Sequence, residues 1–212
     1  AGGVPEVFVT AHDAMVTQAQ LQRGETLLVH AVGSGVGTAA LQLGHSMGCT
    51  VVGTARTPEK LERCEALGLD HAVLASRTFD PVALADDITA AAGPVDVAIE
   101  LVGGDYLLTD VRVAAPLGRI VLVGMMAGMR AELDMGSLMF KRLRLFGTTL
   151  RGRSVAEKAA ATNAFTRDVV PLLASGAIAP VVARTFPLVD GPEAYELLRS
   201  DAVFGTIVLD LT

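Results

Sequence analysis

Tryptophan is absent from this 212-residue sequence, and all aromatic residues together make up only 4% of it. A surface on which single-stranded bases stack therefore has little to be built from. The net charge of −6 also opposes a broad contact with phosphate backbones. Nucleic acid is not an expected partner.

Cysteine is scarce as well. Cys49 and Cys64 are too few for a disulfide framework or a cysteine-rich zinc site, so we expect a reducing, cytoplasmic compartment and no bound metal. No apolar run approaches the roughly 20 residues that span a bilayer, so we expect no membrane association. The first residues, Ala1 to Pro5, carry no signal-peptide pattern and resemble a cut into a longer chain.

What the chain does contain is a regular alternation of short apolar segments with amphipathic ones. Strands are predicted at residues 26–32, 50–55, 71–74, 95–100, 118–124 and 143–149, and helices at 38–47, 58–68, 81–92, 106–114 and 155–175. Near-continuous apolar strands are typical of parallel sheets that helices cover on both faces. The sequence therefore predicts an α/β fold with a doubly wound, six-stranded parallel Rossmann sheet.

The last part of the sequence departs from this alternation. Two strands at 181–186 and 205–211 flank one helix at 192–200 and follow a complete set of six strands. We therefore divide the chain into a nucleotide-binding domain, residues 1–178, which includes a lead-in helix, and a return segment, residues 179–212. This short βαβ segment is expected to belong to a second lobe that is mostly absent.

A glycine-rich loop, Gly33-Ser34-Gly35-Val36-Gly37, follows the first predicted strand. Glycines at a strand-to-helix turn leave backbone N–H groups beside the positive end of the helix dipole, where a pyrophosphate binds. The third glycine also lets the helix pack closely on the strand. The literal G-x-G-x-x-G spacing is missing, so a plain tight turn remains the alternative. Residues 34 to 37 are the predicted contacts.

The end of the second strand distinguishes the two nicotinamide cofactors. NAD-binding domains place a carboxylate there for the ribose hydroxyl, whereas this sequence has Thr54, Arg56 and Lys60. Arg56 suits bidentate binding of a 2′-phosphate and Lys60 adds a point charge, so the sequence favours NADP(H). A solvated arginine and lysine are the alternative. The missing carboxylate also argues against a methyltransferase that uses S-adenosylmethionine.

Further contacts are expected beyond the carboxyl ends of later strands, where open α/β sheets bind their ligands. Val102 and Gly103 follow the fourth strand, and Val123, Gly124 and Met125 lie at the end of the fifth. Ordinary turn chemistry is the alternative explanation for these glycines. The histidines are scattered without metal-ligand spacing, and no side chain is identified as a catalytic acid or base.

Taken in order, these motifs resemble the cofactor domain of the medium-chain dehydrogenase/reductase superfamily, specifically its quinone oxidoreductase branch. The resemblance covers nearly the whole chain and lies in residues 29–43, 59–68, 140–151, 186–194 and 205–209. It implies a zinc-independent two-domain reductase that transfers hydride from NADPH to a small-molecule quinone or enone-type acceptor. By position it also implies that Thr10, Thr149 and Leu150 lie near the nicotinamide.

The resemblance further implies a GroES-like lobe before residue 1 and a homodimer of the full-length protein, paired along residues 143–150. Thr206 stands where the branch often has lysine, and Tyr195 where histidine is common, which puts contacts near the active site in question. Two alternatives remain. One is the cofactor domain of a zinc-dependent alcohol dehydrogenase, and the other is a nucleotide-sensing module without catalysis. By itself this chain is expected to bind cofactor with little or no turnover.

Overall fold

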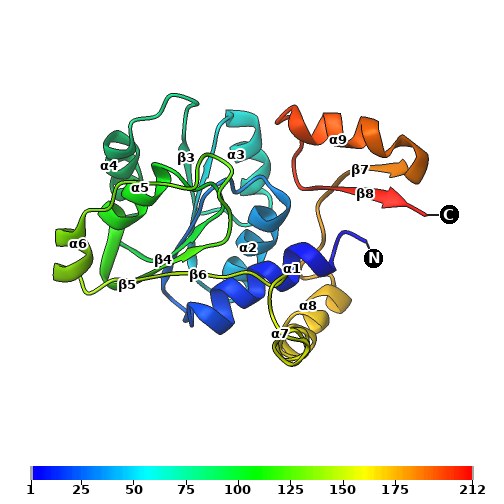
Figure 1. The fold of residues 1–212 in the computed structure, drawn as a ribbon, viewed down its shortest axis with the longest axis horizontal. Helices are drawn as coiled ribbons and strands as arrows, with labels where there is room; N and C mark the ends of the chain where they lie inside the picture. The colour runs from blue at the N-terminus through cyan, green and yellow to red at the C-terminus, as the bar shows by residue number, and fades with distance from the viewer. Residues whose placement is uncertain (1, 212) are drawn as a thin grey trace.

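The computed structural model, which describes residues 2–211, contains a six-stranded parallel sheet with helices on both faces (Figure 1). The strands lie in the order β3-β2-β1-β4-β5-β6, and every neighbouring pair runs parallel. Their bounds are β1 Thr26–Val29, β2 Thr50–Ala55, β3 His71–Leu74, β4 Val95–Glu100, β5 Ala114–Leu122 and β6 Arg144–Gly147. The direction of travel across the sheet reverses between β1 and β4, where such folds bind ligands. The predicted doubly wound α/β fold is confirmed.

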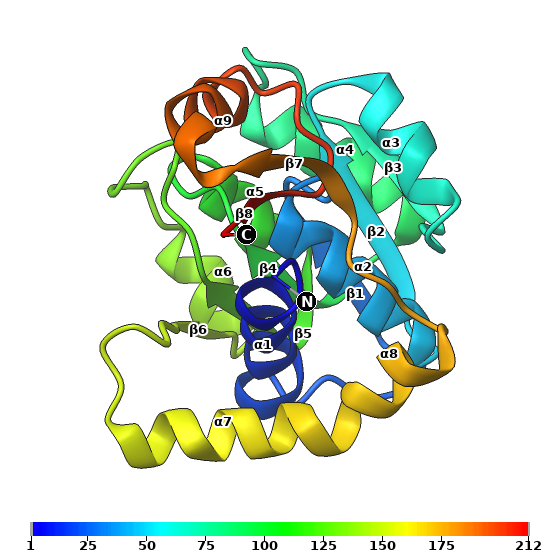
Figure 2. The same ribbon diagram turned by 90° about the vertical axis from the view of Figure 1, so that its right-hand side faces the viewer.

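Helices divide between the two faces of this sheet. Their bounds are α1 Pro5–His12, α2 Gly35–Ser46, α3 Pro58–Glu65, α4 Pro81–Ala92, α5 Tyr106–Val113, α6 Met135–Phe140, α7 Val155–Asp168, α8 Val170–Ser175 and α9 Gly191–Arg199. The first three pack on one face, and α4 and α5 pack on the other. Helix α7 crosses beneath α1 (Figure 2). The helices cover the two faces of the sheet, and the connecting loops surround the carboxyl ends of the strands.

The central strands are apolar on both sides because each side faces a different core. Leu27 and Val29 of β1 point into the core under α1 and α2. Leu28, between them, points into the core under α4 and α5. Successive side chains of a strand alternate between faces, so a strand covered on both sides reads as one apolar run. Full burial of a leucine or valine contributes roughly 1.5–3 kcal/mol, so β1 anchors the loop that follows it.

Two predicted segments differ from the structure. The single helix expected over 155–175 is broken into α7 and α8 at Val169, whose φ is −105°. Pro171 explains the break, since it has no N–H to donate to the carbonyl of Arg167 and its ring crowds the preceding turn. The methionine-rich segment after β5 contains α6, where no helix was predicted. The side chain of Asp134 caps this helix by accepting from two backbone N–H groups.

The end of the chain forms a separate unit of two strands and a helix. Strands β7, Val182–Pro187, and β8, Thr206–Asp210, pair in parallel, and α9 lies between them in sequence, so the predicted βαβ segment is present. Figure 1 shows this unit beside the main sheet. The N–H of Gly205 donates to the carbonyl of Gly33 at 2.8 Å, which joins the unit to the glycine-rich loop. Across residues 2–211, none of the helices is both long and apolar enough to cross a membrane.

Candidate cofactor-binding site

The glycine-rich loop turns sharply from β1 into α2. Ala31 takes a left-handed backbone conformation, with φ of 49°, and Ser34 caps the helix by accepting from the N–H of Gly37 at 3.1 Å. A Cβ added to Gly37 would lie 2.7 Å from the carbonyl oxygen of Val32, so only glycine lets the helix approach this closely. The first N–H groups of a helix have no acceptor within the helix and lie at its positive dipole end. The start of the 12-residue α2, at Gly35 and Val36, therefore suits an anion.

Three cavities lie around this loop along the carboxyl edge of the sheet. The glycine-loop cavity, of about 280 Å³, is lined by Gly33, Ser34, Gly35, Arg56, Lys60 and Asp201, among others. The Tyr106 cavity, of about 140 Å³, is lined by Thr54, Arg56, Arg77, Phe79, Val102 and Tyr106, among others. The Thr149 cavity, of about 230 Å³, is lined by Glu6, Thr10, Asp13, Val123, Thr148, Thr149, Leu150 and Arg151. Arg56 lines both of the first two cavities, so they adjoin at its side chain.

Three cations gather at the tip of β2, and a carboxylate stands among them. The Arg56 guanidinium lies 2.5 Å from Asp201, and the Lys60 ammonium donates to the backbone carbonyl of Asp201 at 2.6 Å. Arg77 approaches the same carboxylate to 3.9 Å. Partial burial raises the pKa of Asp201, but hydrogen bonds and charge from Arg56 and Lys60 outweigh it and hold that pKa below its ordinary value. This carboxylate was not anticipated from the sequence.

The Tyr106 cavity offers aromatic walls to a flat ring. The rings of Phe79 and Tyr106 lie 4.3 Å apart, tilted by 48°. Thr54 lines the same cavity, but its hydroxyl turns inward and lies 2.8 Å from Nδ1 of His30. The predicted contact by Thr54 therefore has its side-chain oxygen already engaged.

Three titratable side chains are fully buried behind this cavity. Nε2 of His30 lies 3.1 Å from Asp110 and 3.9 Å from Glu100. Burial, together with the other carboxylate, raises the pKa of Glu100 to about 7, against the opposing charge of His30. Burial likewise raises the pKa of Asp110 to about 8 and lowers that of His30. Over residues 2–211 this is the single group of three or more side chains with metal-ligand spacing.

Glu100 also shapes the loop after β4. Its Oε1 accepts from the N–H of Gly103 at 2.7 Å and from that of Val102. The two residues predicted to contact the cofactor here have therefore given their backbone donors to the protein. A Cβ at Gly124 would collide with the carbonyl of Leu101, so this glycine keeps the ends of β4 and β5 close together.

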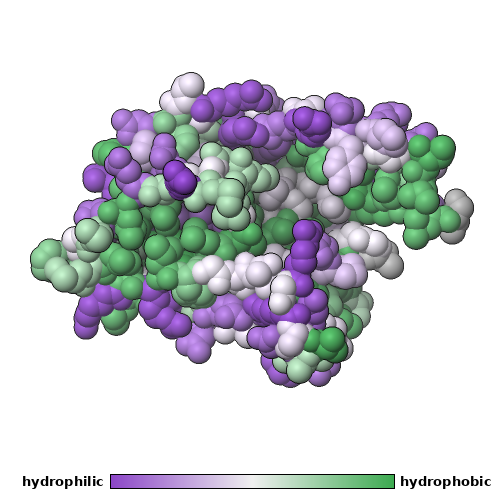
Figure 3. Space-filling model, viewed as in Figure 1, coloured by the Kyte–Doolittle hydropathy of each residue, from purple (hydrophilic) through white to green (hydrophobic). Residues whose placement is uncertain are grey.

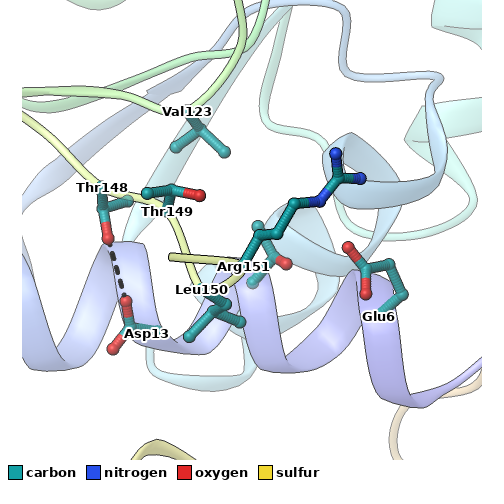
Figure 4. Close-up of a pocket in the computed structure, with 8 residues that line it drawn as sticks. Glu6, Asp13, Val123, Thr148, Thr149, Leu150 and Arg151 are labelled. Carbon is teal, nitrogen blue, oxygen red and sulfur yellow. Dashed lines mark hydrogen bonds between the residues drawn. The ribbon is translucent and has the colours of Figure 1, made fainter. Parts of the chain in front are cut away.

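The Thr149 cavity is bounded by α1 and by the loop after β6 (Figure 4). Asp13 opens the π-helix Asp13–Gln18, a rare geometry that is frequent at functional sites. Arg153 donates to both carboxylate oxygens of Asp13, at 2.9 and 2.6 Å, and Thr148 donates to it at 3.2 Å. In Figure 4 the Arg151 side chain extends away from Asp13, and its guanidinium lies on the side of the cavity where Glu6 is.

The predicted contacts thus divide among the three cavities. Thr10, Val123, Thr149 and Leu150 share the Thr149 cavity, Ser34, Gly35, Arg56 and Lys60 share the glycine-loop cavity, and Thr54 and Val102 share the Tyr106 cavity. Gly37, Gly103 and Gly124 act through backbone geometry, and Met125 is exposed. Their contacts with a cofactor stay predictions. Asp201 was missed because it is far from the other residues in sequence, and Tyr106 and Phe79 because no motif marks them.

The comparison with protein families matches residues 35–165 to the model described as zinc-binding dehydrogenase. The chain belongs to this family. Its fold and its glycine-rich loop agree with this assignment, and the chain is a cofactor-binding domain of the medium-chain dehydrogenase/reductase superfamily. The family resemblance inferred from the sequence is confirmed.

Among curated relatives, the chain is 33% identical over 213 residues to the spectinabilin polyketide synthase system protein NorB of Streptomyces orinoci. All of this chain is covered, but only 9% of the relative.

Several solved structures share the fold of this dehydrogenase-family chain. The quinone oxidoreductase of Thermus thermophilus, solved also with NADPH, is 28% identical with a TM-score of 0.84, covering 99% of this chain and 65% of that one. The CurK enoyl reductase is 26% identical with a TM-score of 0.81, covering 98% and 61%. An NAD-dependent alcohol dehydrogenase is 27% identical with a TM-score of 0.83, covering 99% and 58%. This chain therefore spans less than two thirds of each of them.

Proposed function

We propose that this chain is the NADPH-binding part of a reductase that transfers hydride to a carbonyl-conjugated acceptor, a quinone or an enone-type compound. The observation that carries the proposal is the cluster of Arg56, Lys60 and Arg77 at the tip of β2. NAD-specific domains have a carboxylate on this strand end for the ribose hydroxyl, whereas here Arg56 directly follows β2, and Lys60 of α3 and Arg77 after β3 lie near it. A 2′-phosphate suits such a cluster because charge-assisted, bidentate hydrogen bonds are the strong ones.

The cavities suggest how the cofactor lies. The pyrophosphate would accept from the N–H groups of Gly35 and Val36, and the adenine would enter the Tyr106 cavity against Tyr106 and Phe79. The nicotinamide would then occupy the Thr149 cavity on the other side of the loop. This orientation brings the 2′-phosphate to Arg56, which lines both the glycine-loop and Tyr106 cavities.

When bound, the reduced nicotinamide supplies the hydride, and the protein holds the ring and its acceptor. Thr10 and Thr149 line the cavity, so their hydroxyls would serve the carboxamide, while Val123 and Leu150 give it apolar walls. Arg151 lines the same cavity, and its positive charge would stabilise an acceptor oxygen that becomes negative there. We assign the proton to solvent or to a second lobe, because Asp13 is held by Arg153.

The acceptor class is supported by two of the structural neighbours, which are named as a quinone oxidoreductase and an enoyl reductase. Both names describe reduction of an electron-poor system conjugated to a carbonyl group. We also propose that residues 179–212 belong to a second, GroES-like lobe that completes the substrate pocket.

A homodimer paired along β6 completes the proposal. Strand β6 is one of the two edge strands of the main sheet, and Met135, Met139 and Phe140 of the neighbouring α6 are exposed. Figure 3 shows apolar surface over this part of the molecule. Light scattering of the intact protein tests this, and a monomer at all concentrations would remove it.

The test of the cofactor is a calorimetric titration of the intact protein with NADPH and NADH, beside Arg56→Ala. We expect wild type to prefer NADPH, and the variant to lose roughly tenfold or more of that preference, since a hydrogen bond to a charged group contributes about 1.5–3 kcal/mol. Equal binding of both cofactors by wild type would contradict the proposal.

The acceptor is tested by NADPH consumption with a quinone, an enone and an enoyl thioester, and binding without any consumption would favour a nucleotide sensor.

A zinc-dependent alcohol dehydrogenase is the second candidate, favoured by the family description and by the alcohol dehydrogenase neighbour. The one ligand-like group within residues 2–211, His30 with Glu100 and Asp110, is buried behind the Tyr106 cavity and away from the Thr149 cavity. Zinc at the nicotinamide would therefore need ligands from another part of the protein. Elemental analysis together with alcohol oxidation by the intact protein separates the two candidates.

A further inference from the structure

Asp201 holds the position that an anionic ligand of the β2 tip would need. It lies in the loop between α9 and β8, and its side chain reaches Arg56 and Lys60 on the other side of the glycine-loop cavity. Its backbone is left-handed, with φ of 64°, a conformation that aspartate and asparagine adopt more readily than most residues. Two anchors place this loop, the donation from Lys60 to the Asp201 carbonyl and the pairing of Gly205 with Gly33.

The carboxylate and a phosphate would compete for the same donors. Asp201 Oδ2 lies 2.5 Å from Nη2 of Arg56 and 3.9 Å from Nη2 of Arg77, while Oδ1 lies 3.3 Å from Nζ of Lys60. Two carboxylate oxygens are thus shared among three cations. A phosphate monoester, with three oxygens and more negative charge, matches the same triangle of donors more fully.

The ion pair between Asp201 and Arg56 is weak enough for another anion to replace the carboxylate. The Arg56 and Arg77 side chains are 45% and 75% exposed, and that of Asp201 is 25% exposed, so the ion pairs with the two arginines contribute little to stability. Lys60 is 17% exposed, and its donation to the Asp201 backbone carbonyl does not involve the carboxylate. A phosphate from solution can therefore displace the Asp201 carboxylate from Arg56 at a small cost in free energy, whereas breaking a buried pair would cost much more.

We propose that Asp201 is an internal competitor for the 2′-phosphate of NADPH. In the cofactor-free protein its carboxylate neutralises Arg56 and Lys60, and it gives up Arg56 when the phosphate binds. NADH has no phosphate at this place and gains nothing from the exchange. Asp201 therefore lowers the preference for NADPH over NADH below what the three cations alone would give. This inference rests on the proposed function, since it takes NADPH to be the cofactor.

The same carboxylate has a rival role. Asp201 comes to the tip of β2 from a distant part of the sequence, and it could accept from the ribose 2′-hydroxyl of NADH as the missing strand-end carboxylate does in NAD-binding domains. The two roles predict opposite effects of removing the charge. Competition predicts tighter binding of a 2′-phosphate, and a ribose contact predicts weaker binding of a nucleotide with a free 2′-hydroxyl.

The test uses Asp201→Asn in the intact protein, because asparagine keeps the size of the side chain and tolerates the left-handed backbone. The probes are adenosine 2′,5′-bisphosphate and adenosine 5′-phosphate, titrated by calorimetry. Glu193→Gln is the matched control, since it removes one negative charge from α9 at a residue paired with Arg184 and outside the three cavities. Arg56→Ala is titrated beside them.

We expect Asp201→Asn to bind the bisphosphate roughly three- to tenfold more tightly than wild type, as the loss of one or two partly exposed ion pairs implies. Its affinity for adenosine 5′-phosphate should change little. Glu193→Gln should bind both probes as wild type does. If Arg56→Ala binds the bisphosphate more weakly than wild type but Asp201→Asn does not bind it more tightly, the competition is overturned and the NADPH proposal stands. Weaker binding of the 5′-phosphate by Asp201→Asn would overturn it in favour of the ribose contact. If neither wild type nor Asp201→Asn distinguishes the two probes, both proposals fail.

Discussion

Two arginine–aspartate pairs stand at opposite ends of the candidate cofactor site. At the Thr149 cavity, Arg153 lies 2.6 Å from Asp13, and at the glycine-loop cavity, Arg56 lies 2.5 Å from Asp201. Their distances are nearly the same, but their surroundings differ. The Asp13 and Arg153 side chains are 2% and 17% exposed, whereas those of Asp201 and Arg56 are 25% and 45% exposed.

This difference in burial assigns the two pairs different roles. A buried charge that loses its partner cannot recover the hydration that it gave up on folding, so Asp13 and Arg153 fix the π-helix to the loop after β6. A partly exposed pair is screened by water and contributes little, so Asp201 and Arg56 are free to change partners. Distance alone does not distinguish a structural ion pair from one that a ligand replaces.

The largest effect is expected from Asp13→Asn, which keeps the side-chain shape but removes the charge beside Arg153. We expect the free energy of unfolding to fall by roughly 2–4 kcal/mol, somewhat below the usual loss for a fully buried pair because Arg153 is partly exposed. Denaturant unfolding measures it, and Asp201→Asn is the matched control, with an expected change of about 1 kcal/mol or less. Equal losses in the two variants would show that burial does not separate the pairs.

A third carboxylate environment sharpens the comparison, because Glu100 and Asp110 are buried without any arginine. Burial raises their pKa values to about 7 and about 8, so the folded protein keeps protons that the unfolded chain releases. Stability therefore falls as the pH rises towards these values. Below about 6.5 the lowered pKa of His30 acts in the opposite direction, so the decline is clearest between about pH 6.5 and 8.

Asp110→Asn tests this decline, because it removes one of the two raised pKa values and the carboxylate that helps to raise the other. Wild type should lose roughly 1–2 kcal/mol more than the variant across this range, at up to 1.36 kcal/mol for each pH unit. Unfolding of both proteins in a pH series measures the difference. Parallel curves would mean that the buried carboxyl groups do not titrate in this range.

The smallest effect is expected at Ser154, which lies outside both ends of the site. Ser154 and Glu157 form a capping box at the start of α7, so Ser154→Ala should lower the free energy of unfolding by about 1 kcal/mol. Calorimetric titration should find NADPH affinity unchanged. A loss of NADPH affinity would mean that α7 takes part in the cofactor site. The comparison of the two arginine–aspartate pairs would then not be enough to describe how the site is held.

Local patterns in the sequence predicted what local physics determines. The six strands follow from their apolar runs, and the close packing at Gly37 follows from its place between β1 and α2. Asp201 could not be predicted in this way, because its contact with Lys60 joins residues that are 141 positions apart. No pattern in either segment marks the other.

Two other differences between prediction and structure, at Thr54 and at the break between α7 and α8, could have been predicted from the sequence. Thr54 and Val52 lie two residues apart on β2, so they share a face of the sheet, and Val52 belongs to the core under α4 and α5. This places the Thr54 side chain inward, towards His30. Pro171 likewise marked the break between α7 and α8. The burial of Asp13 depended on the π-helix, for which the sequence carries no clear pattern.

Gly2 and Gly3 lie against the strands of the return segment. A methyl group on Gly3 would lie 3.1 Å from the Val182 side chain, and one on Gly2 would lie 3.2 Å from Val208. The segment that leads into α1 is therefore packed against β7 and β8, which are far from it in sequence. For protein engineering, a fusion joint placed at Gly2 or Gly3 needs small residues, because a larger side chain there would press on these two strands.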